Sequence, residues 1–360
     1  MLKILYDPKY NFHIGYHSEI IKSTSKDILW IKGHLVNKYE FCIRSKDPSV
    51  RKKFISLGYF KERSFDGVIF SPRVFLLNKN PYFLEIEDIW WFFGDTYEEV
   101  YSSCLIPKWK VKELEQHFCR KNLIHVFWWS RAAIERFKVF CKINSVSPFV
   151  IDHVLRISSV LYPSSPTNDS RVRQKREKKE IISVFDKNNF YRKGGDVILE
   201  IFGRLFKSGI NNYFLKIFGS YPSCFRRVIQ NTPNISFLPI TSRNKFQKAL
   251  SLADIFIFSS RADTFGTVLI DAINNGCFVV STYGKTVFAT REILQKYPNK
   301  IIIKNLYRNE VYGEIDKERF YKVIRFLLLK DVKYRKWKSP FNRDELKKNF
   351  LKIILSKSRI

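Results

Sequence analysis

The stretch RADTFGTVLIDAINNG, residues 261–276, decides the fold of the second half of the chain. The apolar run ADIFIFSS leads into it, and a second apolar run, CFVVS, follows it. Apolar residues from Val268 to Ile273 recur at helical spacing, which predicts a helix that packs on a sheet through one face. Gly276 stands where a left-handed residue commonly ends a helix. A buried strand, a helix and another buried strand form the repeating unit of a parallel α/β sheet.

The same alternation of strands and helices runs through the rest of this half. Strands are predicted at 181–186, 213–220, 235–240, 254–260, 277–282 and 300–305, with helices at 194–209 and 243–253. Fully apolar strands are typical of parallel sheets covered on both faces. Since ligands bind beyond the carboxyl ends of such strands, a site is expected in the loops after residues 186, 219, 240, 260 and 282.

The first half alternates in a similar way. Strands are predicted at 66–71, 82–88 and 123–130, and helices at 106–121 and 131–143. Ser130 stands at the N-cap position of the latter helix. Residues 162–180 are rich in Pro, Ser and charge and have no periodic apolar face, which predicts a linker between two domains.

The chain is strongly basic. Its 360 residues include 64 Lys and Arg against 34 Asp and Glu, which gives a net charge of +30. Such a charge attracts nucleic acid, anionic lipid headgroups or phosphorylated small molecules, and does not choose among them. A Lys-rich coding bias is an equal alternative explanation.

Cysteine usage and hydropathy bear on location. The six cysteines form no CxxC pair and have apolar neighbours, so buried free thiols in a reducing compartment are expected. No run of about 18 uncharged apolar residues occurs, and the N-terminus lacks a signal-peptide pattern. We expect a cytoplasmic protein, either free or peripheral on the inner face of a membrane.

The start of the opening helix is a candidate phosphate site. Thr264 is expected to cap a helix whose first N–H groups belong to Phe265, Gly266 and Thr267. Helix N-termini carry unpaired donors and a partial positive charge, so they hold phosphates. Gly266 lets a ligand approach the backbone closely.

Two carboxylates accompany this phosphate site. Asp263 directly precedes it, and Asp271 shares a helix face with Thr264 and Thr267. A carboxylate accepts two hydroxyl hydrogen bonds well, and a sugar and a ribose on either side of a diphosphate each present such a hydroxyl pair. The alternative is that Asp263 is a helix cap and Asp271 a solvated position on the helix.

The segment DTFGTVLIDAINNGCFVVS resembles the signature of the retaining glycosyltransferases of family 4, which have the GT-B fold and use nucleotide sugars. That signature has an acidic residue, then Gly or Thr, Phe and Gly, and a second acid after seven intervening residues. The segments YRKGGDVILEIF and ISFLPITSRNKFQKALSLADIFIFSSR are also similar to the family, so the resemblance covers about 180–285. It implies two Rossmann-like doubly wound parallel-sheet domains that face a cleft.

The resemblance implies roles for individual residues. Asp263 would face the donor sugar and Lys193 would neutralise the leaving diphosphate, both as catalytic residues. Asp271 would contact the ribose hydroxyls. The other donor-binding positions implied are Arg192, Lys187, Thr264, Phe265, Gly266, Thr267 and Val268.

The chain departs from the family pattern at two points. The second acid of the family is nearly always Glu, and Asp271 is shorter by one methylene. The usual arginine about five residues before Lys193 is replaced by Asn188, with Lys187 adjacent to it.

Resemblance in the first half is weaker. YFLEIEDIWWFFG is similar to a segment of the acceptor domain, which makes Glu87 and Asp88 acceptor-side candidates. A structural role in a turn is an equal alternative for both. The glycine-rich loop of the family falls near residues 7–18, where Gly15 is the acceptor-side candidate.

The expected domains follow from the linker and the resemblance. They are an N-terminal acceptor-side domain over 1–162, a linker over 163–180, a nucleotide-sugar-binding domain over 181–340, and a helix in 341–360 that crosses back to the N-terminal domain.

These observations lead to one function and one rival. The resemblance implies a retaining glycosyltransferase that moves a sugar from a nucleoside-diphosphate sugar to a glycan or lipid-linked acceptor. The resemblance also implies that basic side chains and helix amides replace a divalent metal at the diphosphate, so neither a metal nor another cofactor is expected, and the absence of a D-x-D motif agrees with this. Lys and Arg beside aromatics in 106–121 and 131–143 suggest docking on an anionic membrane, or simply a solvated face. The rival is a non-catalytic GT-B-like protein that binds nucleic acid or another polyanion, although no nucleic-acid-binding motif supports this.

Overall fold

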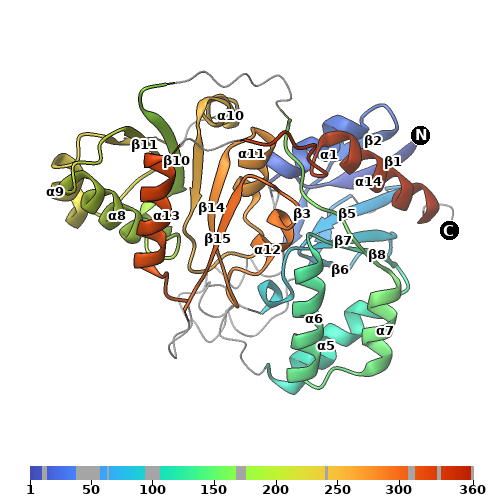
Figure 1. Ribbon diagram of the computed structural model, residues 1–360. Coiled ribbons are helices and arrows are strands. Elements are labelled where there is room, and N and C mark those ends of the chain that lie inside the picture. The colour runs from blue at the N-terminus through green and yellow to red at the C-terminus, as the bar shows by residue number, and fades with distance from the viewer. Residues whose placement is uncertain are drawn as a thin grey trace. The chain divides into compact units, whose positions relative to one another are not determined.

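The computed structural model describes residues 1–9, 14–37, 57–62, 65–93, 106–167, 176–239, 242–306, 313–330 and 334–357. The chain divides into two compact units. Unit 1 consists of Met1–Ser164 and Arg343–Ile360, and unit 2 of Ser165–Asn342. Each unit is built around a six-stranded sheet (Figure 1).

The main sheet of unit 1 is parallel throughout. Its strands, in spatial order, are β2 (Ile28–Lys32), β1 (Leu2–Tyr6), β5 (Val68–Pro72), β7 (Tyr82–Ile86), β8 (Leu123–Trp128) and β9 (Ser158–Val160). In the described residues of this unit the helices are α1 (Ile14–Thr24), η1 (Ile89–Phe92), α5 (Lys108–Phe118), α6 (Arg131–Ile143), α7 (Pro148–Arg156) and α14 (Arg343–Lys357). A smaller sheet, which was not predicted, contains β3 (Leu35–Asn37), β4 (Leu57–Phe60) and β6 (Phe75–Leu76).

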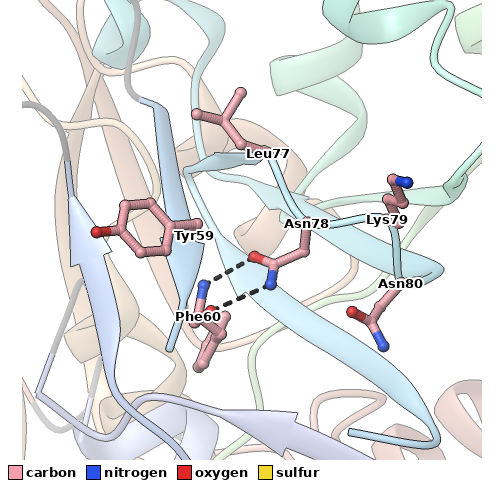
Figure 2. Close-up of a pocket in the computed structure, with 6 residues that line it drawn as sticks. All are labelled: Tyr59, Phe60, Leu77, Asn78, Lys79 and Asn80. Carbon is pink, nitrogen blue, oxygen red and sulfur yellow. Dashed lines mark hydrogen bonds between the residues drawn. The ribbon is translucent and has the colours of Figure 1, made fainter. Parts of the chain in front are cut away.

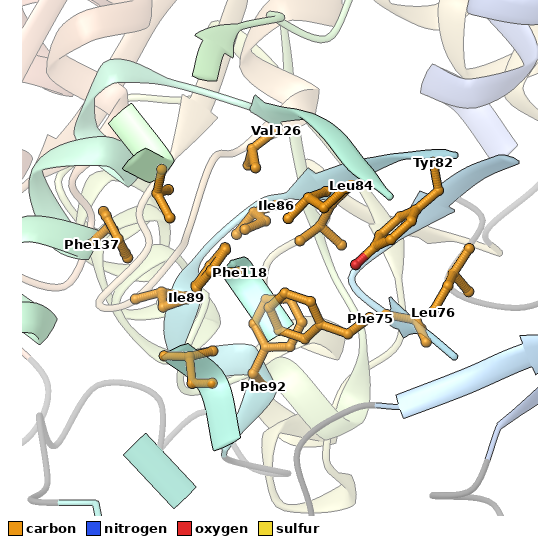
Figure 3. Close-up of a cluster of buried hydrophobic side chains, with 14 of the residues drawn as sticks. Phe75, Leu76, Tyr82, Leu84, Ile86, Ile89, Phe92, Phe118, Val126 and Phe137 are labelled. Atoms are coloured by element: carbon orange, nitrogen blue, oxygen red, sulfur yellow. The ribbon is translucent and has the colours of Figure 1, made fainter. Parts of the chain in front are cut away.

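The core of unit 1 lies between its main sheet and the helices of residues 108–156. Figure 3 shows its centre, where rings from the strand region and the helices meet. Phe75 lies edge-on to Phe118, with ring centroids 5.0 Å apart, and Phe118 meets Phe137 at 5.7 Å. All three rings are buried. Each such ring contributes about 1.5–3 kcal/mol to folding through burial.

Helix α14 packs within unit 1 although it follows unit 2 in the sequence. The ring of Phe350 stacks on Trp30 with centroids 5.9 Å apart. Arg343 pairs with Glu19 of α1 at 2.6 Å. Unit 1 is therefore assembled from two separate parts of the chain.

The sheet of unit 2 is also parallel throughout. Its spatial order is β12 (Ile235–Leu238), β11 (Tyr213–Gly219), β10 (Lys179–Phe185), β13 (Ile255–Phe258), β14 (Phe278–Tyr283) and β15 (Lys300–Lys304). The helices are η2 (Lys187–Asn189), α8 (Gly195–Lys207), η3 (Ser223–Phe225), α9 (Arg226–Gln230), α10 (Arg243–Leu252), α11 (Thr267–Asn274), α12 (Ala289–Leu294) and α13 (Lys317–Leu329). The order changes direction between β10 and β13, so a ligand crevice is expected at the carboxyl ends of these two strands.

Most sequence expectations about the fold are confirmed. Both units are doubly wound α/β structures, and Ser130 caps α6 by accepting from the Ala133 N–H at 3.0 Å. Gly276 has φ 67° just after α11, as expected for its end.

Two expectations are wrong. Thr264 does not cap α11, because this helix begins at Thr267 with Gly266 at its N-cap in the left-handed region. Of the cysteines that the structure describes, Cys141 and Cys277 are buried free thiols, but Cys119 and Cys224 are exposed. Cys42 and Cys104 lie outside the described residues.

Candidate functional site

The candidate site lies at the carboxyl ends of β10 and β13, which are neighbours in the sheet of unit 2. After β10, Asp186 caps η2 by accepting from the Asn188 N–H at 2.9 Å. The loop then reaches Gly194 at φ 71°. A Cβ at Gly194 would collide with the Ser259 carbonyl oxygen, so glycine allows this loop to lie against the end of β13.

Lys193 and Asp263 meet across this approach. Lys193 Nζ forms an ion pair with Asp263 Oδ2, and both side chains are largely buried. The same ammonium lies 5.3 Å from the centre of the Phe258 ring. The Asp263 N–H donates to Thr286 O at 2.7 Å, which holds its loop in place. The two predicted catalytic residues thus come together, and a cation lies beside the start of α11.

The neighbouring guanidinium groups fasten the two loops to each other. Arg192 Nη1 donates to Ala262 O at 2.8 Å, and its Nε donates to Asn189 Oδ1 at 3.0 Å. Arg261 makes a bidentate pair with Asp196, with both distances 2.7 Å. Arg192, a predicted donor-binding residue, therefore also links the two loops.

Lys187 lies elsewhere on the same loop. It is exposed, and its backbone N–H donates to Ser220 Oγ at 2.9 Å.

The residues that directly follow Asp263 form the approach to α11 and its first turn. Thr264, Phe265 and Gly266 are buried, while Thr267 and Val268 are half-buried at the start of the helix. A Cβ at Gly266 would lie 3.0 Å from the Phe258 ring, and its φ of 72° also favours glycine. No side chain caps the helix, and the N-terminal end of its dipole lies next to Asp263 in sequence.

Asp271 occupies a buried position, so the alternative of a solvated helix position is wrong. Its Oδ1 accepts from Ser165 Oγ at 2.5 Å, Arg243 Nη2 at 2.8 Å and Gln247 Nε2 at 2.5 Å. These donors come from the start of unit 2 and from α10. Sequence reasoning missed Arg243 and Gln247, because the direction of α10 relative to α11 leaves no signal in the pattern.

The acceptor-side candidates lie in unit 1. Asp88 is fully buried, caps η1 by accepting from the Trp90 N–H at 3.1 Å, and pairs with Arg136 at 2.6 Å. Burial raises the pKa of the Asp88 carboxyl, and the Arg136 charge opposes that shift. The structural alternative is thus observed for Asp88. Glu87 lies 3.6 Å from Arg73, and Gly15 lies in the first turn of α1.

A buried acid–imidazole pair also lies in unit 1 and was not predicted. His17 Nε2 is 2.6 Å from Glu85 Oε2, and both side chains are buried. The signal available was Glu85 itself, a charged residue inside the apolar strand YFLEI.

A separate pocket of about 410 Å³ opens beside β4 of unit 1. Figure 2 shows its lining: Tyr59, Phe60, Leu77, Asn78, Lys79 and Asn80. The Asn78 amide accepts from Phe60 N–H at 2.7 Å and donates to Phe60 O at 3.1 Å. Since 77–80 directly precede β7, this pocket lies toward the amino end of that strand, away from the edge where such sheets bind ligands.

No group of three or more His, Cys, Asp and Glu side chains in the described residues could hold a metal ion. No described helix is both long enough and apolar enough to span a membrane.

Comparison with known proteins identifies the domain that carries the site. Residues 167–334 match the family described as glycosyl transferases group 1. This match supports glycosyl transfer as the activity. No curated protein matches the chain.

Solved structures with the GT-B fold resemble the whole chain. A structure of Alr3699/HepE from Anabaena in complex with UDP has a TM-score of 0.61 at 11% identity, with 99% of this chain and 100% of that chain covered. The lipopolysaccharide outer core galactosyltransferase WaaB has a TM-score of 0.57 at 12% identity, with 99% of each chain covered. WaaG, a glycosyltransferase involved in lipopolysaccharide biosynthesis, has a TM-score of 0.53 at 14% identity, with 100% of this chain and 95% of that chain covered. At these identities the likeness shows the fold, which is GT-B.

Proposed function

We propose that this protein transfers a sugar from a nucleoside-diphosphate sugar to a glycan or lipid-linked acceptor, with retention of configuration. The observation that carries the proposal is the Lys193–Asp263 pair beside the start of α11. It lies within the residues that match glycosyl transferases group 1. The HepE structure with UDP makes a uridine diphosphate donor the first to test.

The chemistry follows from the charge that develops as the donor breaks. When the bond from the anomeric carbon to the diphosphate oxygen breaks, negative charge grows on the leaving diphosphate. The ammonium of Lys193 and the N-terminal end of α11 would stabilise that charge. The acceptor hydroxyl then bonds to the anomeric carbon on the same face, and its proton passes to the leaving phosphate oxygen.

Asp263 has two parts in this proposal. Its carboxylate fixes the Lys193 ammonium, and it can accept a hydroxyl hydrogen bond from the donor sugar. Cationic and backbone groups take the place of a divalent metal at the diphosphate, so we propose that transfer needs neither a metal nor another cofactor. On the acceptor side, Glu87 and Gly15 stay candidates.

Donor hydrolysis or transfer with a panel of UDP-, GDP- and ADP-sugars tests this function. We expect one class of donor to be turned over, and added EDTA to leave the rate unchanged. A rate that is restored only by Mg²⁺ or Mn²⁺ would refute metal independence. If no donor binds, and oligonucleotides bind in a way that moderate salt abolishes, the polyanion-binding rival replaces the enzyme.

We also propose that unit 1 docks on anionic lipid at the cytoplasmic face of a membrane. Trp109, Val139 and Phe149 are 52%, 51% and 69% exposed on α5, α6 and α7. Figure 1 shows these three helices grouped together. Exposed apolar side chains among Lys and Arg residues favour insertion at the boundary between headgroups and acyl chains.

A further inference from the structure

The carboxylate of Asp271 has much of its hydrogen-bonding capacity used within unit 2. Three described side chains donate to its Oδ1, from Ser165, Arg243 and Gln247. An oxygen of a carboxylate offers about two lone-pair positions. Asn275 holds Gln247 in turn, because its Nδ2 donates to Gln247 Oε1 at 2.6 Å. Oδ1 therefore serves to fix these side chains and has no lone pair to offer a ribose hydroxyl.

Arg243 lies where a ligand of this sheet is expected. It is the first residue of α10, which follows β12, so it lies toward the carboxyl edge of the sheet of unit 2. Its side chain is 29% exposed, so part of it can be reached by a ligand. Its Nε, in contrast, is buried and has no hydrogen-bond partner among the described residues. A buried donor without a partner is costly and calls for an explanation, such as a ligand.

We propose that Arg243 contacts the nucleoside diphosphate of the donor, and that Asp271 is a positioning residue that acts through it. This inference rests on the function proposed above. A guanidinium presents five N–H donors in a planar fork that suits phosphate oxygens. The contact with Asp271 occupies Nη2 and fixes the plane of the fork. Asp271 would then contribute to nucleotide binding by holding the Arg243 guanidinium in place, and not by contacting the ribose hydroxyls.

The test is a thermodynamic cycle on nucleotide affinity, measured by calorimetry with UDP, GDP and ADP. The variants are Arg243→Gln, Asp271→Asn and the double variant, and the matched control is Arg204→Gln, which removes another ion-paired arginine of unit 2. We expect Arg243→Gln to weaken the preferred nucleotide about 10- to 100-fold. Asp271→Asn should weaken it similarly, and the double variant should be no weaker than either single variant. Arg204→Gln should bind like the wild type.

A 2′,3′-dideoxy form of the same nucleotide separates the two roles of Asp271. If Asp271 acts through Arg243, the loss caused by Asp271→Asn is as large with the dideoxy nucleotide as with the natural one. A loss that disappears with the dideoxy nucleotide would show that Asp271 holds the ribose itself and would overturn the inference.

Folding and the proposed function need separate controls. Circular dichroism establishes that each variant is folded. If Asp271→Asn does not fold, Arg243→Gln alone decides, and wild-type affinity in that variant overturns the inference. Arg243→Lys, which keeps the charge but loses the fork, should recover only part of the affinity. If the wild type binds no nucleotide, the proposed function fails, and this inference fails with it.

Discussion

Lys193 and Asp263 face each other from two loops, and replacing either one affects both stability and chemistry. Removing one partner of a largely buried ion pair leaves the other charge uncompensated and costs about 3 kcal/mol. We therefore expect Asp263→Ala to lower the melting temperature by about 6–12 °C. Turnover of the preferred donor should fall about 100-fold or more, because the transition-state charge loses its fixed cation.

Calorimetry and a donor-hydrolysis assay measure the two effects. Arg204→Gln again serves as control, since it removes an ion pair of unit 2 outside the site. Unchanged turnover in Asp263→Ala would remove this residue from the site.

Gly194 sets the path of the loop that carries Lys193. With φ 71° and the Ser259 carbonyl in the way of a Cβ, Gly194→Ala should cost about 1–3 kcal/mol in the free energy of unfolding. Gly203→Ala is the matched control, because a Cβ there meets nothing within 4 Å. Since Gly203 lies in the interior of α8, Gly203→Ala should raise the free energy of unfolding by about 0.5–1 kcal/mol. Urea unfolding of both variants checks this, and equal effects would contradict the assigned strain.

At the residue scale, the contact between Lys193 and Asp263 could be predicted from the sequence, whereas the contacts of Asp271 could not. Lys193 and Asp263 both follow strands whose carboxyl ends share an edge, so their proximity is implied by the parallel order. The donors to Asp271 include Ser165, 106 positions away in the sequence. Such a contact depends on how a loop and two helices pack, which no local pattern records.

Helices α5, α6 and α7 provide a test at the scale of elements. We expect the full-length protein to cosediment with vesicles that contain anionic lipid, and to cosediment less with neutral vesicles, because unit 1 binds the anionic surface. Replacing Trp109 and Phe149 by Ser should reduce this binding, because both side chains are exposed on these helices. Phe326→Ser is the control, since Phe326 is 56% exposed on α13 of unit 2. Equal loss in the control would argue against a localised docking surface.

Helices and strands were easier to predict from the sequence when their apolar pattern was longer. The strands of unit 2 are mostly apolar runs, and their predicted positions agree with the structure to within a few residues. Strands β3, β4 and β6 have three, four and two residues, too few to show an alternation. The start of α11 was misplaced because Gly266 takes a left-handed conformation, which postpones the first helical residue to Thr267.

The whole molecule should lose stability in mild acid, chiefly in unit 1. Burial lowers the pKa of both His117 and His125 to about 4, with nearby cationic charges adding to the effect. In the unfolded chain both imidazoles titrate near 6.5. Below that pH the unfolded state therefore binds more protons, and the free energy of unfolding falls as the pH drops from about 6.5 to 4.

Thermal unfolding between pH 7.5 and 4.5 checks this pH dependence. Replacing His117 by Gln should flatten the profile, since one of the two titrating groups is removed. A profile as steep as that of the wild type would assign the acid sensitivity to other groups.

At this largest scale, the doubly wound architecture was predictable because it follows from the alternation of strands and helices. The unit against which α14 packs is decided by tertiary contacts, such as that of Phe350 with Trp30. An amphipathic pattern alone does not predict these contacts.

The interrupted course of unit 1 has a consequence for biosynthesis. Residues 165–342 emerge from the ribosome before the segment that contains α14. Unit 2 can therefore reach its native state during translation, whereas unit 1 waits with the apolar surface around Trp30 and Phe70 uncovered until Phe350 arrives. Until then the nascent chain exposes an apolar surface that chaperones bind. A chain that ends near residue 342 lacks α14 and would keep this surface exposed after synthesis.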